Sequence, residues 1–357
     1  MPQIYLLLET RHAALLKMLC GASMHRRHLA PILALGIAVD LVASAAQATE
    51  GGASLYLPGL RGPLAGIVPP PGFYFSSDFL AYSGELSGAR RIQIGGAVLA
   101  DVEVEIRADF LTATWVFPLD AVNGRMAIGA SLPLGVPRVS AGVLIEAPRL
   151  GRTFAFSQRD ASFVLGDPVL TGLVGWDAGK FHWSLGAGVS VPAGGYEEDE
   201  LSNLAFNRWV GDIFAAATWF DPETGWDISG AVGFEINGEN PDTDYRSGNA
   251  FHVDLAVTKN LTKEFSIGLL AGYYDQVSED RGEGNRIGPF KGRVTAVGAS
   301  ATYNLEVAGT PVTARLKVLR EVDVENRPQG TIGLFTVAFP LGGHAAPKTA
   351  SPVVAKD

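Results

Sequence analysis

The stretch Trp226-Asp227-Ile228-Ser229-Gly230-Ala231-Val232-Gly233-Phe234-Glu235-Ile236-Asn237 alternates between two kinds of side chain. Its even-numbered positions carry large apolar residues and one glycine, whereas its odd-numbered positions are small, polar or charged. Successive side chains of a β-strand point to opposite faces. The stretch therefore predicts a strand with one apolar and one polar face, and the same alternation returns in segment after segment.

The first 48 residues have the composition of a secretory signal peptide. Residues 24–28 form a basic cluster, residues 29–45 are mostly apolar, and Ala46-Gln47-Ala48 is a small-x-small cleavage site. We expect Met24 to be the true start and cleavage to follow Ala48. An N-terminal membrane anchor is the alternative, which is disfavoured because the apolar run is short and contains Asp40.

Composition narrows the class of protein. The net charge of −9 disfavours nucleic acid and anionic membrane surfaces as partners, and the single cysteine, Cys20, lies in the presequence. After residue 48 no stretch approaches the ~18 apolar residues that a membrane-spanning helix needs. An exported chain of two-faced strands predicts an all-β transmembrane barrel, with lipid outside and water inside.

We expect twelve antiparallel strands, an even number that leaves both termini in the periplasm. They span residues 73–83, 104–117, 125–134, 161–176, 180–191, 207–220, 225–237, 248–259, 264–276, 292–304, 311–323 and 330–339. Turn residues form short connectors on one side, and long polar loops join the strands on the other. Residues 141–147 are interpreted as a hairpin arm above the membrane; fourteen strands is the alternative. The barrel then covers residues 73–339, and residues 340–357 form a flexible tail.

Charged side chains on the strands are assigned to the lumen, because a lipid-facing Arg or Lys near the midplane costs ~2–4 kcal/mol. We expect these residues to pair across neighbouring strands and keep the lumen hydrated. The alternative is that they bind a polar ligand head or set ion selectivity. The polar lumen set is His182, Asp212, Asp227, Glu235, His252, Asp254, Arg315, Lys317 and Glu321.

Several segments together resemble the meta-pathway of phenol degradation family. They are Ala65-Gly66-Ile67-Val68-Pro69-Pro70-Pro71-Gly72-Phe73-Tyr74, Gly166-Asp167-Pro168, residues 245–252, residues 265–280 and residues 321–327. The resemblance covers essentially the whole mature chain. It implies a barrel similar to the outer-membrane transporters of long-chain fatty acids and aromatic hydrocarbons. The ligand does not carry over, because the family name reflects gene context.

Residues 49–72 precede the first strand and are rich in glycine and proline, so they cannot form a regular strand or helix. One interpretation is a flexible periplasmic lead-in. The other is a plug folded into the lumen, as in the fatty-acid transporters, whose apolar residues meet a hydrophobic ligand. The candidate plug and ligand residues are Leu55, Tyr56, Leu60, Leu64, Phe214 and Leu270.

No enzyme is expected. His182-Trp183-Ser184 has the spacing of an outer-membrane lipase pair, but both polar residues turn into the lumen, and Tyr196 stands where an orienting Asn would be needed. We expect no metal site and no cofactor.

The sequence thus favours a monomer that takes up small hydrophobic or aromatic compounds passively. The alternative is a general porin or a structural barrel without a selective ligand. The expected partners are outer-membrane lipid and lipopolysaccharide, the barrel-assembly machinery and a small hydrophobic ligand.

Overall fold

The computed structural model describes residues 54–86, 91–94, 97–147, 152–198, 200–286, 288 and 291–342. The predicted signal peptide and nearly all of the predicted tail lie outside the described residues. Among the described residues, no helix is both long and apolar enough to cross a membrane.

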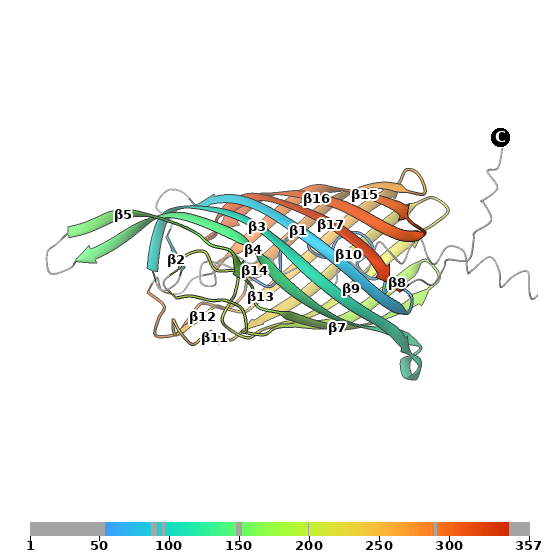
Figure 1. The fold of residues 1–357 in the computed structure, drawn as a ribbon, viewed down its shortest axis with the longest axis horizontal. Helices are drawn as coiled ribbons and strands as arrows, with labels where there is room; N and C mark the ends of the chain where they lie inside the picture. The colour runs from blue at the N-terminus through green and yellow to red at the C-terminus, as the bar shows by residue number, and fades with distance from the viewer. Residues whose placement is uncertain are drawn as a thin grey trace, which may run out of the picture.

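Twelve strands close into an antiparallel barrel (Figure 1), as predicted. The closure is made by the first strand, which pairs with the last strand on one side and with its sequence neighbour on the other. The barrel strands are β1 (Gly72–Leu86), β3 (Ala97–Leu119), β4 (Gly124–Ala147), β7 (Val169–Ala178), β8 (Phe181–Ser190), β9 (Val210–Asp221), β10 (Trp226–Asn237), β13 (Ala250–Asn260), β14 (Phe265–Gln276), β15 (Arg293–Val307), β16 (Thr310–Glu325) and β17 (Gln329–Leu341).

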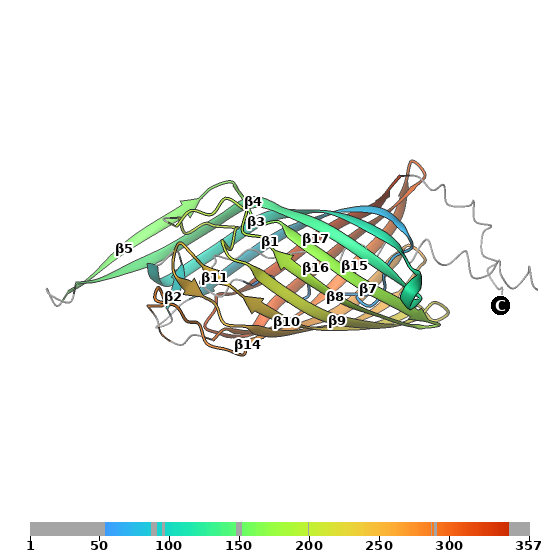
Figure 2. The same ribbon diagram turned by 90° about the horizontal axis from the view of Figure 1, so that it is seen from below.

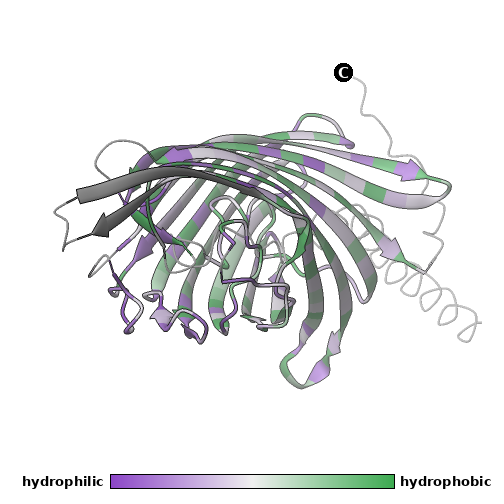
Figure 3. Ribbon diagram, turned by 60° about the vertical axis from the view of Figure 1, so that its left-hand side comes forward, coloured by the Kyte–Doolittle hydropathy of each residue, from purple (hydrophilic) through white to green (hydrophobic). Residues whose placement is uncertain are grey.

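The two faces of the strands are those that the sequence predicts. On β10 the exposed and partly exposed side chains are Trp226, Ile228, Gly230, Val232, Phe234 and Ile236, and all the residues between them are buried. Figure 3 shows hydropathy alternating along the strands in the same way. Apolar residues face outward because the outer surface meets lipid rather than water.

The two ends of the barrel differ. At the short-turn end, tight connectors join the strands, and left-handed residues such as Asn123 and Gly225 close them. At the long-loop end lie β2 (Ile92–Ile94), β11 (Glu239–Asn240) and β12 (Tyr245–Arg246). The long strand β4 continues past the barrel and pairs with β5 (Arg152–Ala161), which forms the predicted arm (Figures 1 and 2).

One predicted strand is interrupted. Residues 161–176 do not run continuously, because β6 (Val164–Leu165) ends at Gly166-Asp167-Pro168 before β7 begins. Pro168 has no N–H to donate to a ladder, and the Asp167 carboxylate binds loop backbone groups described below. Strand β7 is therefore shorter than expected.

A β-bulge exchanges the two faces of β16 after Glu321. Glu321 pairs with Ala296 and Asp323 pairs with Thr295, so Val322 is an extra residue on β16. One extra residue exchanges the two faces of a strand. Asp323, which the plain alternation turns into the lumen, is consequently exposed and lies 3.9 Å from Arg293.

Candidate functional site: a segment held inside the barrel

Residues 54–71, here called the luminal segment, run through the barrel interior and lead into β1 (Figure 1). Most of their side chains are buried. Within the described chain, the backbone of the segment makes two backbone–backbone hydrogen bonds, and each closes a turn inside the segment. They run from Leu60 N to Leu57 O and from Ile67 N to Leu64 O. No ladder bond ties the segment to the wall in this part of the chain, so wall side chains hold it.

Asp254 on β13 binds three groups of the luminal segment. Its Oδ1 accepts hydrogen bonds from the Tyr56 hydroxyl and from Gly59 N, both at 2.7 Å. Its Oδ2 accepts one from Arg61 N at 2.9 Å. Asp254 is 1% exposed, and a buried carboxylate needs such donors because it is cut off from water.

Glu235 on β10 holds the beginning of the described segment. Its Oε2 accepts hydrogen bonds from Ser54 Oγ at 2.7 Å and from Leu55 N at 2.8 Å. Its Oε1 accepts one from Asn237 Nδ2 at 2.9 Å. Every oxygen of this buried carboxylate therefore has a donor.

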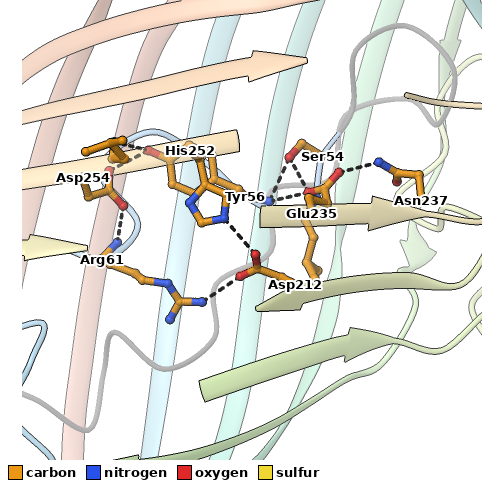
Figure 4. Close-up of polar contacts among 10 residues, drawn as sticks. Ser54, Tyr56, Arg61, Asp212, Glu235, Asn237, His252 and Asp254 are labelled. Carbon is orange, nitrogen blue, oxygen red and sulfur yellow. Dashed lines mark hydrogen bonds and ion pairs between the residues drawn. The ribbon is translucent and has the colours of Figure 1, made fainter. Parts of the chain in front are cut away.

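A chain of contacts joins the segment to β9 and again to β13 (Figure 4). The Arg61 guanidinium lies 3.0 Å from Asp212 Oδ2 on β9, and Asp212 Oδ1 lies 2.8 Å from His252 Nε2 on β13. The His252 ring stacks on Tyr56 with centroids 4.1 Å apart. Arg61 also lies 3.3 Å from the centroid of the Phe214 ring, a cation–π contact.

Nearer the short-turn end, polar wall residues again bind the backbone of the segment. Leu64 N donates to Ser229 Oγ at 2.9 Å and to Asp227 Oδ2 at 3.1 Å. Lys317 Nζ donates to Leu60 O at 2.9 Å. Gly66 packs against the wall so closely that a Cβ there would lie 2.6 Å from Thr218 N.

The predicted plug and ligand residues lie in four apolar clusters rather than in one pocket. Tyr56, Leu60 and Leu270 belong to the largest cluster, which spreads over the inner faces of many strands. Phe214 packs with Val68 and four residues of the wall. Leu55 packs with Phe206, and Leu64 lies against Ile67 and Phe220.

All nine predicted lumen residues face inward, but few make the expected cross-strand pairs. Asp212, Asp227, Glu235, Asp254 and Lys317 instead bind the luminal segment. His252 bridges wall and segment. The other three bind the wall: His182 Nδ1 lies 2.5 Å from Asp177, Arg315 Nε donates to Thr302, and Glu321 accepts from Tyr82.

A loop at the long-loop end folds over the segment. The Asp167 carboxylate accepts hydrogen bonds from the backbone N–H groups of residues 193, 194, 206 and 207. Burial raises the pKa of Asp167, and these four N–H groups act in the opposite direction. The loop thereby places Leu201 and Leu204 against the largest apolar cluster.

Comparison with known proteins places this barrel in a family. A model of the family described as "Putative MetA-pathway of phenol degradation" matches residues 87–335. The chain belongs to this family. A search of curated protein sequences found no match.

One solved structure shows the same fold. The COG4313 outer membrane channel from Pseudomonas putida F1 superposes with a TM-score of 0.60 at 17% identity, covering 77% of this chain and 97% of that one. A FadL homologue from Pseudomonas aeruginosa gives a TM-score of 0.38 at 10% identity, covering 83% and 98%. The closed barrel and its apolar outer surface locate this protein in the outer membrane of a Gram-negative bacterium. The short-turn end is then periplasmic.

Sequence reasoning missed three parts of the site. Arg61 is a single cation within an apolar, proline-rich segment, and that isolation signals a partner of opposite charge. Ser229 and Thr218 lie on the predicted inner face but carry no charge to mark them. The contacts of Asp254 with backbone N–H groups leave no trace in the sequence, because every residue except proline carries the same donor.

Proposed function

We propose that the protein passively transports small hydrophobic or aromatic compounds across the outer membrane and that the luminal segment closes the path at rest. The chain's family membership and its channel-like fold fit a transporter role. The family description links its members to phenol degradation, which supports an aromatic substrate.

The observation that carries the proposal is the apolar character of much of the inner wall. A general porin has a polar, water-filled interior. Here a cluster of buried apolar side chains surrounds Tyr56, Leu57 and Leu60 of the luminal segment. Its inward-facing wall residues include Leu80, Ile106, Phe110, Leu270, Leu319 and Leu334. Such a surface favours an apolar solute over a hydrated one.

The way in which the segment is held supports its role as a gate. It is attached by side chains of the wall, and the barrel ladder closes without it. The segment can therefore move while all inter-strand hydrogen bonds remain. A channel that carries solutes needs such a movable part, because the segment lies buried inside the barrel.

Uptake by cells with and without the gene tests the proposal. We expect deletion of the gene to reduce the initial uptake rate of labelled toluene and to leave the rate for a small hydrophilic sugar unchanged. A strain complemented with the intact gene is the control. Loss of sugar uptake with unchanged toluene uptake would instead support a general porin.

A further inference from the structure

Two carboxylates lie directly opposite each other on the inner wall of the barrel. Asp212 on β9 pairs in register with Glu235 on β10, and both residues are buried in the lumen. Like charges at opposed positions of neighbouring strands repel each other and destabilise the pair. Asp254 on β13 binds the same stretch of the luminal segment, residues 54–61 (Figure 4). The wall thus presents three carboxylates to this stretch.

Donors of the luminal segment compensate for this concentration of negative charge. Arg61, the single cation of the segment, lies 3.0 Å from Asp212 Oδ2. Glu235 and Asp254 accept hydrogen bonds from backbone N–H groups and hydroxyl groups of the segment. Buried carboxylates need such partners, so the charge of the wall is balanced largely by the segment.

The wall itself supplies fewer donors at this level. Asp212 and Glu235 each contact one polar side chain of the wall, His252 and Asn237 respectively. Within the described chain, Asp254 accepts hydrogen bonds from the segment only. His252 Nδ1 has no hydrogen-bond partner among the described residues, and it is assigned as a further acceptor because Nε2 faces a carboxylate. The wall therefore offers acceptors to a cationic group.

Movement of the segment changes the charge of the lumen. Arg61 leaves with the segment, whereas Asp212, Glu235 and Asp254 stay on the wall and meet water. Carboxylates in contact with water are ionised at neutral pH. Lys317 on β16, which donates to Leu60 O in the closed state, remains as a counter-charge but is outnumbered by the carboxylates. A pore lined by carboxylates attracts cations and repels anions.

We propose that the opened lumen is selective for cations, so that among charged solutes it passes ammonium compounds in preference to carboxylates. The inference rests on the proposed movement of the luminal segment and adds a charge preference to the transported class. An aromatic or aliphatic amine combines an apolar body, which the inner wall favours, with a cationic group that Asp254 and Glu235 attract. In the closed state, Arg61 and the N–H groups of the segment take the place of that cationic group.

Reversal potentials across a potassium chloride gradient in planar bilayers test the selectivity. The full-length Gly272→Val variant provides the open path, because Gly272 pairs in register with Asp254 and a Cβ there would lie 2.7 Å from Gly59 N. We expect a preference for K⁺ over Cl⁻ of about threefold. Benzylammonium chloride in place of the potassium salt should give a reversal potential of the same sign.

A second opening variant lies on the segment itself. Tyr56→Ala removes the hydroxyl group that binds Asp254 and the ring that stacks on His252. Tyr56 belongs to no strand, so the barrel ladder stays complete. This variant should show the same cation preference, because every wall charge is retained.

Charge substitutions in these opened variants assign the preference to the wall. Glu235→Gln should lower the preference for K⁺, and Lys317→Gln should raise it, because the two substitutions remove charges of opposite sign. Asp323→Asn is the control, since Asp323 lies at an exposed site outside the lumen, and it should leave the preference unchanged. The heat-dependent shift in gel mobility shows that each variant is folded.

A preference for Cl⁻, or a preference for K⁺ that Glu235→Gln leaves unchanged, would overturn the inference. Folded Gly272→Val and Tyr56→Ala barrels that both stay closed would also overturn it, because the segment would then not leave the wall. Toluene uptake tests the transport function separately. Anion preference together with normal toluene uptake would remove the charge preference alone.

Discussion

Tyr56 of the luminal segment donates its hydroxyl hydrogen bond to Asp254 Oδ1 on β13 at 2.7 Å, across 198 residues of sequence. The same carboxylate accepts hydrogen bonds from the backbone N–H groups of Gly59 and Arg61. Asp254 is therefore a single point at which three bonds between wall and segment can be broken together.

Replacing Asp254 with alanine should loosen the luminal segment and leave the barrel closed. Each hydrogen bond to a charged group contributes about 1.5–3 kcal/mol, and the ladder pairs of β13 remain. We expect brief openings in planar-bilayer recordings, together with a normal heat-dependent shift in gel mobility. Asp323→Ala is the control, because it removes the same charge at an exposed site. The channel of this variant should stay closed. A closed Asp254→Ala channel would show that this carboxylate does not hold the gate.

A steric change should displace the segment without removing any polar side chain that holds it. A Cβ at Gly272 on β14 would lie 2.7 Å from Gly59 N and 2.8 Å from Pro58 Cα, so Gly272→Val should push the segment away. We expect increased ion conductance in bilayers. Gly172 has open space around its Cβ position, so Gly172→Val should behave like the native protein. Equal conductance in the two variants would contradict the close packing described here.

The two faces of β10 can be separated by neighbouring substitutions. Val232→Arg places a charge in lipid, at a cost of ~2–4 kcal/mol near the midplane, and should reduce the amount of assembled barrel. The serine side chain of Ala231→Ser points into the lumen, so this variant should assemble normally. Gly233 is no suitable control, because a Cβ there would lie 2.2 Å from the His252 ring. The measurement is the fraction of heat-modifiable protein in outer-membrane preparations, and similar losses in both variants would refute the assigned faces.

Asp167 should control the order of the loop at residues 191–209. Asp167→Ala leaves four backbone N–H groups without their common acceptor. We expect a protease added to intact cells to cut this loop several times faster than in the native protein. Glu198→Ala removes an exposed charge from the same loop and should leave the rate unchanged. Slow cleavage in Asp167→Ala would mean that other contacts hold the loop.

The wall of the barrel could be predicted from the sequence because lipid imposes one simple requirement on every strand. Val232 and its even-numbered neighbours must be apolar, whereas the inner face is free to vary. Turn residues such as Gly225 then separate the strands. The bulge at Val322 escaped prediction, since one extra residue changes the alternation only from that point onward.

The interior could be predicted only in part. The inward orientation of Asp254 and Glu235 follows from alternation, but their partners do not. Those partners include backbone groups of a segment some 180 to 195 residues earlier in the chain. Its irregular path depends on close contacts such as that of Gly66 with the wall, which no local pattern encodes.

Removal of residues 54–66 tests the central claim most directly. The deletion breaks no ladder bond, so a folded, heat-resistant barrel should form. In planar bilayers we predict that conductance rises from near zero in the intact protein to a steady open level. Intact protein that already conducts as an open pore, with no change on deletion, would contradict the gated transporter and leave a general porin in its place.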